Sequence, residues 1–191
     1  MRKEPDLFEP KDQSDWRKWL MLNHKKEDAV WLVFYKKASM AHNLSWSDAV
    51  DEALCFGWID STKKTMDDVR YKQYFSRRKP KSNWSKINKQ KVDKLIKSKR
   101  MTKAGLESIE IAKENGSWTL LDDVEALIVP IDLEDALASY KTARDYFDGL
   151  SASAKKALLY WVISAKRQET REKRIAEIAE NAAKQQKPKQ F

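Results

Sequence analysis

Residues 58–76 read WIDSTKKTMDDVRYKQYFS, and this stretch decides the fold class. Its second half alternates Val69, Tyr71, Gln73 and Phe75 with Arg70, Lys72 and Tyr74. A period of two is typical of a β-strand with one buried face. We therefore predict two strands, Trp58–Lys64 and Val69–Ser76, joined by a turn around Met66, Asp67 and Asp68.

The residues before this stretch predict a third strand and two helices. Val30–Lys37 reads VWLVFYKK, which is apolar on both faces and indicates a buried strand. Ser14 is the expected cap of a short helix, and Ser45 with Asp48 resembles a capping box for a second helix that stops at Gly57. The sequence predicts an α+β fold whose amino-terminal half holds a small, mainly antiparallel sheet of about three strands.

From Ser82 onward the pattern is helical, and five helices are expected. The predicted starts are Ser82 or Asn83, Thr102, Asp132, Ser151 and Thr170, with stops near Gly116 and Gly149. The pattern breaks after Glu114, which divides the chain into an α+β domain at 1–118 and a helical region at 119–191, expected to pack on the first. The polar tail after Ala183 is expected to fray.

The positive charge is concentrated in one segment. Between Arg70 and Lys103 there are fourteen Lys or Arg residues and one acid, Asp93, so this segment has a formal charge of +13. The whole chain is +9, which leaves −4 for the remainder. Such a segment repels itself unless an anion lies nearby, so we expect an anionic partner.

The junction between the second strand and the Trp84 helix is the candidate anion site. Arginine matches phosphate or carboxylate with two-point contacts, tryptophan offers a flat face, and a helix start adds amide donors. The alternative interpretation is that the tryptophans belong to the core and the charges form a solvated rim. The residues predicted to bind the anion are Arg70, Arg77, Arg78, Lys81, Ser82, Trp84 and Asn88, and Trp58 and Asp60 are candidates for a pocket.

Two ligand classes remain open, a phosphorylated metabolite and nucleic acid. Interleaved aromatic and basic residues suit a single strand, because stacking tolerates any base. The chain has no zinc finger, glycine-rich phosphate loop or aromatic signature of an RNA-binding sheet. Support for nucleic acid is therefore compositional.

The sequence offers few candidate catalytic residues. His24 and His42 fall in predicted loops without neighbours at ligand or triad spacing, so we predict no catalytic residue, metal or cofactor. Cys55, flanked by Leu54 and Phe56 at a helix end, is expected to be buried packing. Asp60 is expected to pair with Arg70 or Arg77, either as a structural ion pair or, in the alternative of a small-molecule enzyme, as a general base in a pocket with an arginine.

The single cysteine excludes an internal disulfide and a thiolate metal cluster, and fits a reducing compartment. No apolar run follows the basic residues of Met1–Pro10, and no eighteen-residue apolar window occurs. We expect a cytoplasmic protein without membrane insertion.

The carboxy-terminal residues suggest a third class, a module for protein–protein interaction. Ile175, Ile178, Ala179 and Ala182 form a narrow apolar stripe, for which Trp161 and Val162 are the expected acceptors. If the last helix stood away instead, the stripe would support a dimer. The expected state is a monomer or weak dimer.

Two groups of residues resemble the YdeI/OmpD-associated family of bacterial proteins. The first is Ala53–Ser61 with Tyr71, Phe75, Arg77, Arg78, Pro80, Ser82, Trp84, Ser85 and Asn88, and the second is Ala165–Arg167, Glu169–Arg171, Arg174 and Ile175. Matches between them are Met101, Thr102, Gly105, Leu106, Ala112, Lys113 and Gly116–Trp118. Ser76 departs from the family pattern of threonine followed by proline. The resemblance implies a role in bacteriocin protection or envelope stress, and a porin partner through the family name alone.

Overall fold

The computed structural model describes residues 5–36, 39 and 41–191. Lys37, the last residue of the first predicted strand, lies outside the described residues, as do residues 1–4 of the amino-terminal segment. The chain divides into two compact units, residues 1–119 and 120–191, and each is described by itself.

The first unit is built around a four-stranded sheet in the order β1-β2-β4-β3. The strands are β1 (Leu7–Phe8), β2 (Ala29–Tyr35), β3 (Trp58–Thr65) and β4 (Arg70–Arg77). β1 pairs with β2 in parallel, and the other two pairings are antiparallel. The predicted α+β class and mainly antiparallel sheet are confirmed, and β1 adds a fourth strand because two residues are too few to show a period.

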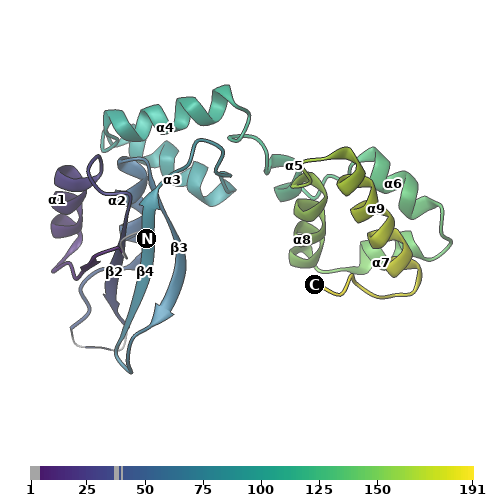
Figure 1. Cartoon of the computed structure of the whole chain (residues 1–191), viewed down its shortest axis with the longest axis horizontal. Helices are drawn as coiled ribbons and strands as arrows, with labels where there is room; N and C mark the ends of the chain where they lie inside the picture. Colours follow the sequence, from purple (N-terminus) through teal and green to yellow (C-terminus); the bar gives the residue numbers. More distant parts are fainter. Residues whose placement is uncertain (1–4, 37–38, 40) are drawn as a thin grey trace. The chain divides into compact units, whose positions relative to one another are not determined.

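The alternation along β4 separates two faces of the sheet. Tyr71, Gln73 and Phe75 lie opposite Phe34, Leu32 and Val30 of β2. This core face packs against α1 (Gln13–Asn23) and α2 (Trp46–Cys55), whose buried residues include Trp16, Leu20, Val50 and Leu54. We call the opposite side, with Trp31, Val33, Lys64, Lys72 and Tyr74, the outer face. Figure 1 shows the strands running side by side with α1 and α2 next to them.

The helix starts of the first unit follow the capping residues, with two corrections. Ser45 caps α2 and Thr102 caps α4 (Lys103–Glu114), as predicted. Asp12, not Ser14, caps α1, because the Asp12 carboxylate accepts from the Asp15 amide. Ser85, not Ser82 or Asn83, caps α3 (Lys86–Lys97). The chain turns at Ser82, whose amide donates to Lys79 O, so the helix begins later.

The second unit is entirely helical. It contains α5 (Asp122–Glu125), α6 (Ile131–Ala138), α7 (Ala143–Gly149), α8 (Ala152–Ile163) and α9 (Gln168–Ala183). Residues 82–191, all described, thus form seven helices instead of the predicted five, because α5 and α7 are too short to show a helical period. Ser151 caps α8 as predicted, whereas Asp132 and Thr170 lie inside helices that follow Pro130 and Arg167.

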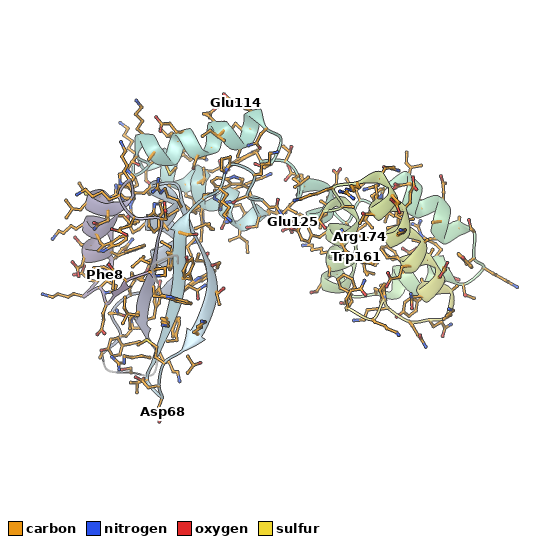
Figure 2. All side chains as sticks on the ribbon, in the orientation of Figure 1. Phe8, Asp68, Glu114, Glu125, Trp161 and Arg174 are labelled. Carbon is orange, nitrogen blue, oxygen red and sulfur yellow. The ribbon has the colours of Figure 1, made fainter. Side chains whose placement is uncertain are left out.

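The apolar stripe of α9 is buried within its own unit. Ile175, Ile178, Ala179 and Ala182 share a core with Val162, and Trp161 packs against it as predicted. The guanidinium carbon of Arg174 lies 5.2 Å from the centre of the Trp161 ring, and Arg174 Nη1 donates to Trp161 O at 2.5 Å (Figure 2). The alternative of a stripe that stands away for a dimer is therefore wrong. The tail is also held, because Phe191 packs on Trp161 with ring centres 5.5 Å apart.

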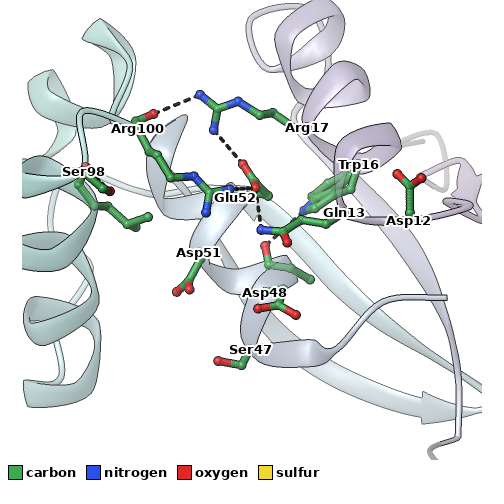
Figure 3. Close-up of polar contacts among 12 residues, drawn as sticks. Asp12, Gln13, Trp16, Arg17, Ser47, Asp48, Asp51, Glu52, Ser98 and Arg100 are labelled. Carbon is green, nitrogen blue, oxygen red and sulfur yellow. Dashed lines mark hydrogen bonds and ion pairs between the residues drawn. The ribbon is translucent and has the colours of Figure 1, made fainter. Parts of the chain in front are cut away.

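A buried carboxylate joins three parts of the first unit. Glu52 lies on the inner side of α2 and is 1% exposed. Its oxygens accept from Gln13 Nε2 at 2.7 Å, from Arg17 Nη1 at 2.7 Å and from Arg100 Nη2 (Figure 3). Arg17 Nη2 also donates to Arg100 O at 3.0 Å. α1, α2 and the segment between α3 and α4 are thereby tied to one charge.

Glu52→Gln is expected to lower the free energy of unfolding by about 2–4 kcal/mol, because two guanidinium groups lose the buried charge that compensates them. The matched control is Asp51→Asn on the adjacent residue, whose carboxylate is 26% exposed against 1% for Glu52, so loss of its pair with Lys91 should cost less, about 1 kcal/mol. Urea unfolding of both variants tests this. Equal losses would contradict it.

Close packing of α4 on the end of α2 requires a glycine. Thr102 donates to Cys55 O through both its amide, at 3.1 Å, and its hydroxyl, at 2.6 Å. One helical turn later, a Cβ on Gly105 would lie 2.4 Å from Cys55 O and 2.8 Å from Cys55 C. No side chain fits between these two backbones, so Gly105 sets how closely α4 approaches α2.

Gly105→Ala is therefore expected to lower the free energy of unfolding by about 1–3 kcal/mol through overpacking. Gly149→Ala is the comparison, since nothing lies within 4 Å of a Cβ there, and it should leave stability unchanged or slightly raised. Thermal unfolding of the two variants distinguishes them. A neutral Gly105→Ala would show that α4 can move away from α2 freely.

Candidate functional site

The predicted cationic residues do not all meet. Arg70 and Arg77 stand at opposite ends of β4, roughly 24 Å apart at 3.4 Å per residue. Arg70 pairs with Asp67 at 2.8 Å, at the turn end that Asp68 marks in Figure 2. The hydrogen bond that the Arg70 side chain donates to the Asp67 carboxylate raises the pKa of Arg70 and lowers the pKa of Asp67. Arg70 is therefore far from the helix junction and already paired.

Arg77 and Asp60 also differ from prediction. Arg77 pairs with Asp28 at 2.6 Å. Asp60 Oδ2 instead accepts from Trp46 Nε1 and Gln73 Nε2, both at 2.9 Å. The predicted ion pair of Asp60 with Arg70 or Arg77 is wrong, because those arginines have nearer acids and Asp60 lies on the core face beside neutral donors.

Arg78 is a predicted residue whose charge is buried without an ion pair among the described residues. Its Nη1 donates to Asn83 O at 2.7 Å. Its Nε and Nη2 are buried and have no hydrogen-bond partner among the described residues, and the same is true of Trp84 Nε1. The guanidinium carbon lies 3.7 Å from the centre of the Trp84 ring. Nε–H and one Nη2–H share an edge of the planar guanidinium, so the edge without a partner is one that grips an oxyanion at two points.

Burial makes this charge unfavourable in the folded chain. Desolvation lowers the pKa of Arg78 to about 10, and the charge of Asp60 opposes the shift only in part. A shift of this size corresponds to about 3 kcal/mol against the charged form. Since the folded pKa is below the unfolded one, this destabilisation is fully present below pH 10 and is relieved as the pH rises above it.

An aromatic and polar scaffold holds the junction in place. The Trp84 ring, 1% exposed, packs on Trp118 with centres 5.0 Å apart. Pro80 O accepts from Asn115 Nδ2 at 2.8 Å and from Ser117 Oγ at 3.2 Å. The turn after Arg78 is thus fastened to the turn after α4.

The remaining predicted residues have mostly structural roles. Lys81 is exposed, Ser82 forms the turn with Lys79, and the Asn88 amide donates to the Ser85 cap. Trp58 is fully buried and its Nε1 donates to His24 O at 3.3 Å. The interpretation of tryptophans as core therefore holds for Trp58, and Trp84 combines core burial with the stacked arginine.

Asp60 lines a pocket of about 380 Å³ on the core face. Its lining is Trp46, Asp60, Lys63, Tyr71 and Gln73. Lys63 Nζ lies 4.1 Å from the Tyr71 ring centre, and burial raises the pKa of Tyr71. The cation that lines this pocket is Lys63. The enzyme alternative requires a pocket that holds Asp60 together with an arginine, and no arginine is among the residues that line this one.

Cys55 is buried as predicted, and burial raises the pKa of its thiol despite the hydrogen bond with Arg17. A second cavity of about 260 Å³ is lined by His24, Lys25, Thr102, Lys103, Ala104 and Glu107. Across the described ranges, no group of His, Cys, Asp and Glu side chains could hold a metal ion. No helix among those residues is long and apolar enough to cross a membrane.

Residues 8–108 match a family model described as a domain of unknown function, DUF8412. The chain belongs to this family. Residues 126–185 match a second model, described as Bacteriocin-protection, YdeI or OmpD-Associated, which confirms the family suspected from the carboxy-terminal motif. The other motif, Ala53–Asn88, lies in the part that the DUF8412 model covers. No match is found among curated proteins or solved structures.

Sequence reasoning missed the parts of the Arg78 site that come from distant segments. Trp118, Asn115 and Ser117 follow α4 more than thirty residues after Arg78, and only the tertiary fold brings them to the junction. A signal was present in Gly116, whose positive φ of 78° permits the turn. Nothing in the pattern indicated that this turn fastens Pro80.

Proposed function

We propose that the DUF8412 unit binds the phosphate or carboxylate group of an anionic ligand, with Arg78 as the anchor. The observation that carries the proposal is the buried Nε and Nη2 edge of Arg78, which lacks an acceptor among the described residues. Leaving buried donors unpaired is costly, and each one calls for a specific explanation. An oxyanion on this edge satisfies both donors and compensates the charge.

The neighbours of Arg78 support the same ligand chemistry. Trp84 covers one face of the guanidinium and fixes its plane. Lys79 and Lys81 lie exposed on the turn directly after Arg78, where they attract anions without pairing to the ligand directly. The arrangement favours a planar two-point contact at Arg78 over a diffuse charge effect.

The distribution of charge separates the two units. Residues 1–119 contain 26 basic and 17 acidic residues, whereas residues 120–191 contain 12 of each. The formal charge of +9 therefore belongs entirely to the unit that holds Arg78. This supports an anionic ligand for the first unit and a different task for the second.

The name of the second unit's family adds a biological context. Its description joins bacteriocin protection with YdeI and OmpD association. We propose that this chain has a role in protection against bacteriocins or envelope stress, in which the first unit binds an anionic metabolite or nucleic acid. The chemistry at Arg78 is common to both ligand classes.

Phosphate is expected to raise the melting temperature of the full chain, compared with sodium chloride at equal ionic strength. At ten times the dissociation constant, the stabilisation is about 1.4 kcal/mol, which corresponds to a few degrees. Arg78→Met should remove this rise. Without phosphate, Arg78→Met should be as stable as the parent chain or up to about 2 kcal/mol more stable, because the desolvated charge is gone.

The matched control is Arg77→Gln, which removes the neighbouring arginine that already pairs with Asp28. It should keep the full phosphate-dependent rise. Equal rises in all three proteins would place phosphate elsewhere, and no rise in the parent chain would mean that the Arg78 edge serves a buried water. Either result contradicts the proposal.

A further inference from the structure

The outer face of the sheet carries a second cationic site. Lys64 of β3 and Lys72 of β4 lie directly opposite each other. Both ammonium groups lie over the ring of Trp31, with Nζ at 5.1 Å and 4.7 Å from its centre. The two nitrogens are therefore at most about 10 Å apart. Like charges at directly opposed positions destabilise a sheet.

No ion pair compensates these two lysines among the residues that the structure describes. The neighbouring cation on this face is Arg70, two residues before Lys72 on β4, and it pairs with Asp67 and Glu9. Trp31 attracts both ammonium groups, and their stems leave it only 7% exposed. The Trp31 ring thus holds the ammonium groups of Lys64 and Lys72 close together on the outer face.

An aromatic ring lies beside this pair of charges. Tyr74 is opposite Trp31 and meets it edge to face, with centres 5.0 Å apart. Tyr74 is half-buried, so part of its ring faces outward two residues along β4 from Lys72. These ring and cation contacts all join strand residues, and the helices of the buried core lie on the other face.

We propose that the outer face binds single-stranded nucleic acid, with one backbone phosphate between Lys64 and Lys72 and a base against Tyr74. A phosphate between two ammonium groups turns their repulsion into attraction. An aromatic ring next to it accepts any base by stacking, which is how sheet faces and grooves hold single strands without reading sequence. This site is separate from Arg78, and either site can exist without the other.

The chain offers a closely matched control for this proposal. Lys63 and Lys64 are adjacent in β3 but project to opposite faces. Lys63 lies over Tyr71 and lines the pocket of the core face. Lys63→Gln and Lys64→Gln therefore remove the same charge from neighbouring positions, and only Lys64→Gln alters the outer face.

The experiment measures fluorescence anisotropy of a labelled oligothymidylate with the full chain at several salt concentrations. The double variant Lys64→Gln/Lys72→Gln should lose at least about tenfold in affinity, and the salt slope should become shallower by about 0.7, the value for one neutralised phosphate of a single strand. Lys63→Gln should bind as the parent chain does. Circular dichroism confirms that each variant is folded.

Three results would overturn the proposal. The double variant binds as tightly as the parent chain, or Lys63→Gln loses as much as Lys64→Gln, which would reveal a dependence on total charge alone. The third is binding to vesicles of phosphatidylserine with no binding to the oligonucleotide, which would assign the face to a membrane surface. A double variant Lys64→Gln/Lys72→Gln that loses oligonucleotide binding but keeps the phosphate-dependent rise in melting temperature separates this proposal from the one at Arg78.

Discussion

Burial of the Glu52 carboxylate is the constraint on which the first unit depends. A charge that is 1% exposed must be compensated, and its partners come from α1 and from the segment after α3. Those partners can reach it only if α1 and α3 flank α2 at fixed positions. The same arrangement leaves Cys55 O at the end of α2 open to Thr102, so α4 begins where the Glu52 cluster ends. The charge therefore orders three helices in space.

Placement of α4 in turn determines the surroundings of Arg78. The turn after α4 supplies Asn115 and Ser117 to the Pro80 carbonyl, and it brings Trp118 to Trp84. Arg78 is enclosed by this assembly without receiving an acid. The Nε and Nη2 edge of Arg78 thus lacks a partner among the described residues, which sets it apart from the ordinary surface pairs of Arg70 and Arg77.

The sequence predicted the fold class, three strands and several caps because these depend on local rules. Alternation along β4 and the Ser45–Asp48 pattern act within a few residues. The choice of Ser85 over Ser82 as a cap depends on a turn, so it could not be predicted locally. Of the candidate site, Arg78 and Trp84 were found. Glu52 was missed because a buried acid is recognisable only from the distant arginines that face it.

The bulge in β3 has a consequence for how robust the charge pattern is. Asp60 pairs with Phe75 and Lys63 with Gln73, so β3 spends one residue more than β4 over this span. If the bulge closed with every residue retained, Lys63 would lie opposite Lys72 and Lys64 opposite Tyr71. Each side of the sheet would still present a lysine. A doublet of identical residues next to an irregularity therefore keeps a lysine on each side of the sheet through a one-residue shift of register, even where the backbone hydrogen bonds must rearrange.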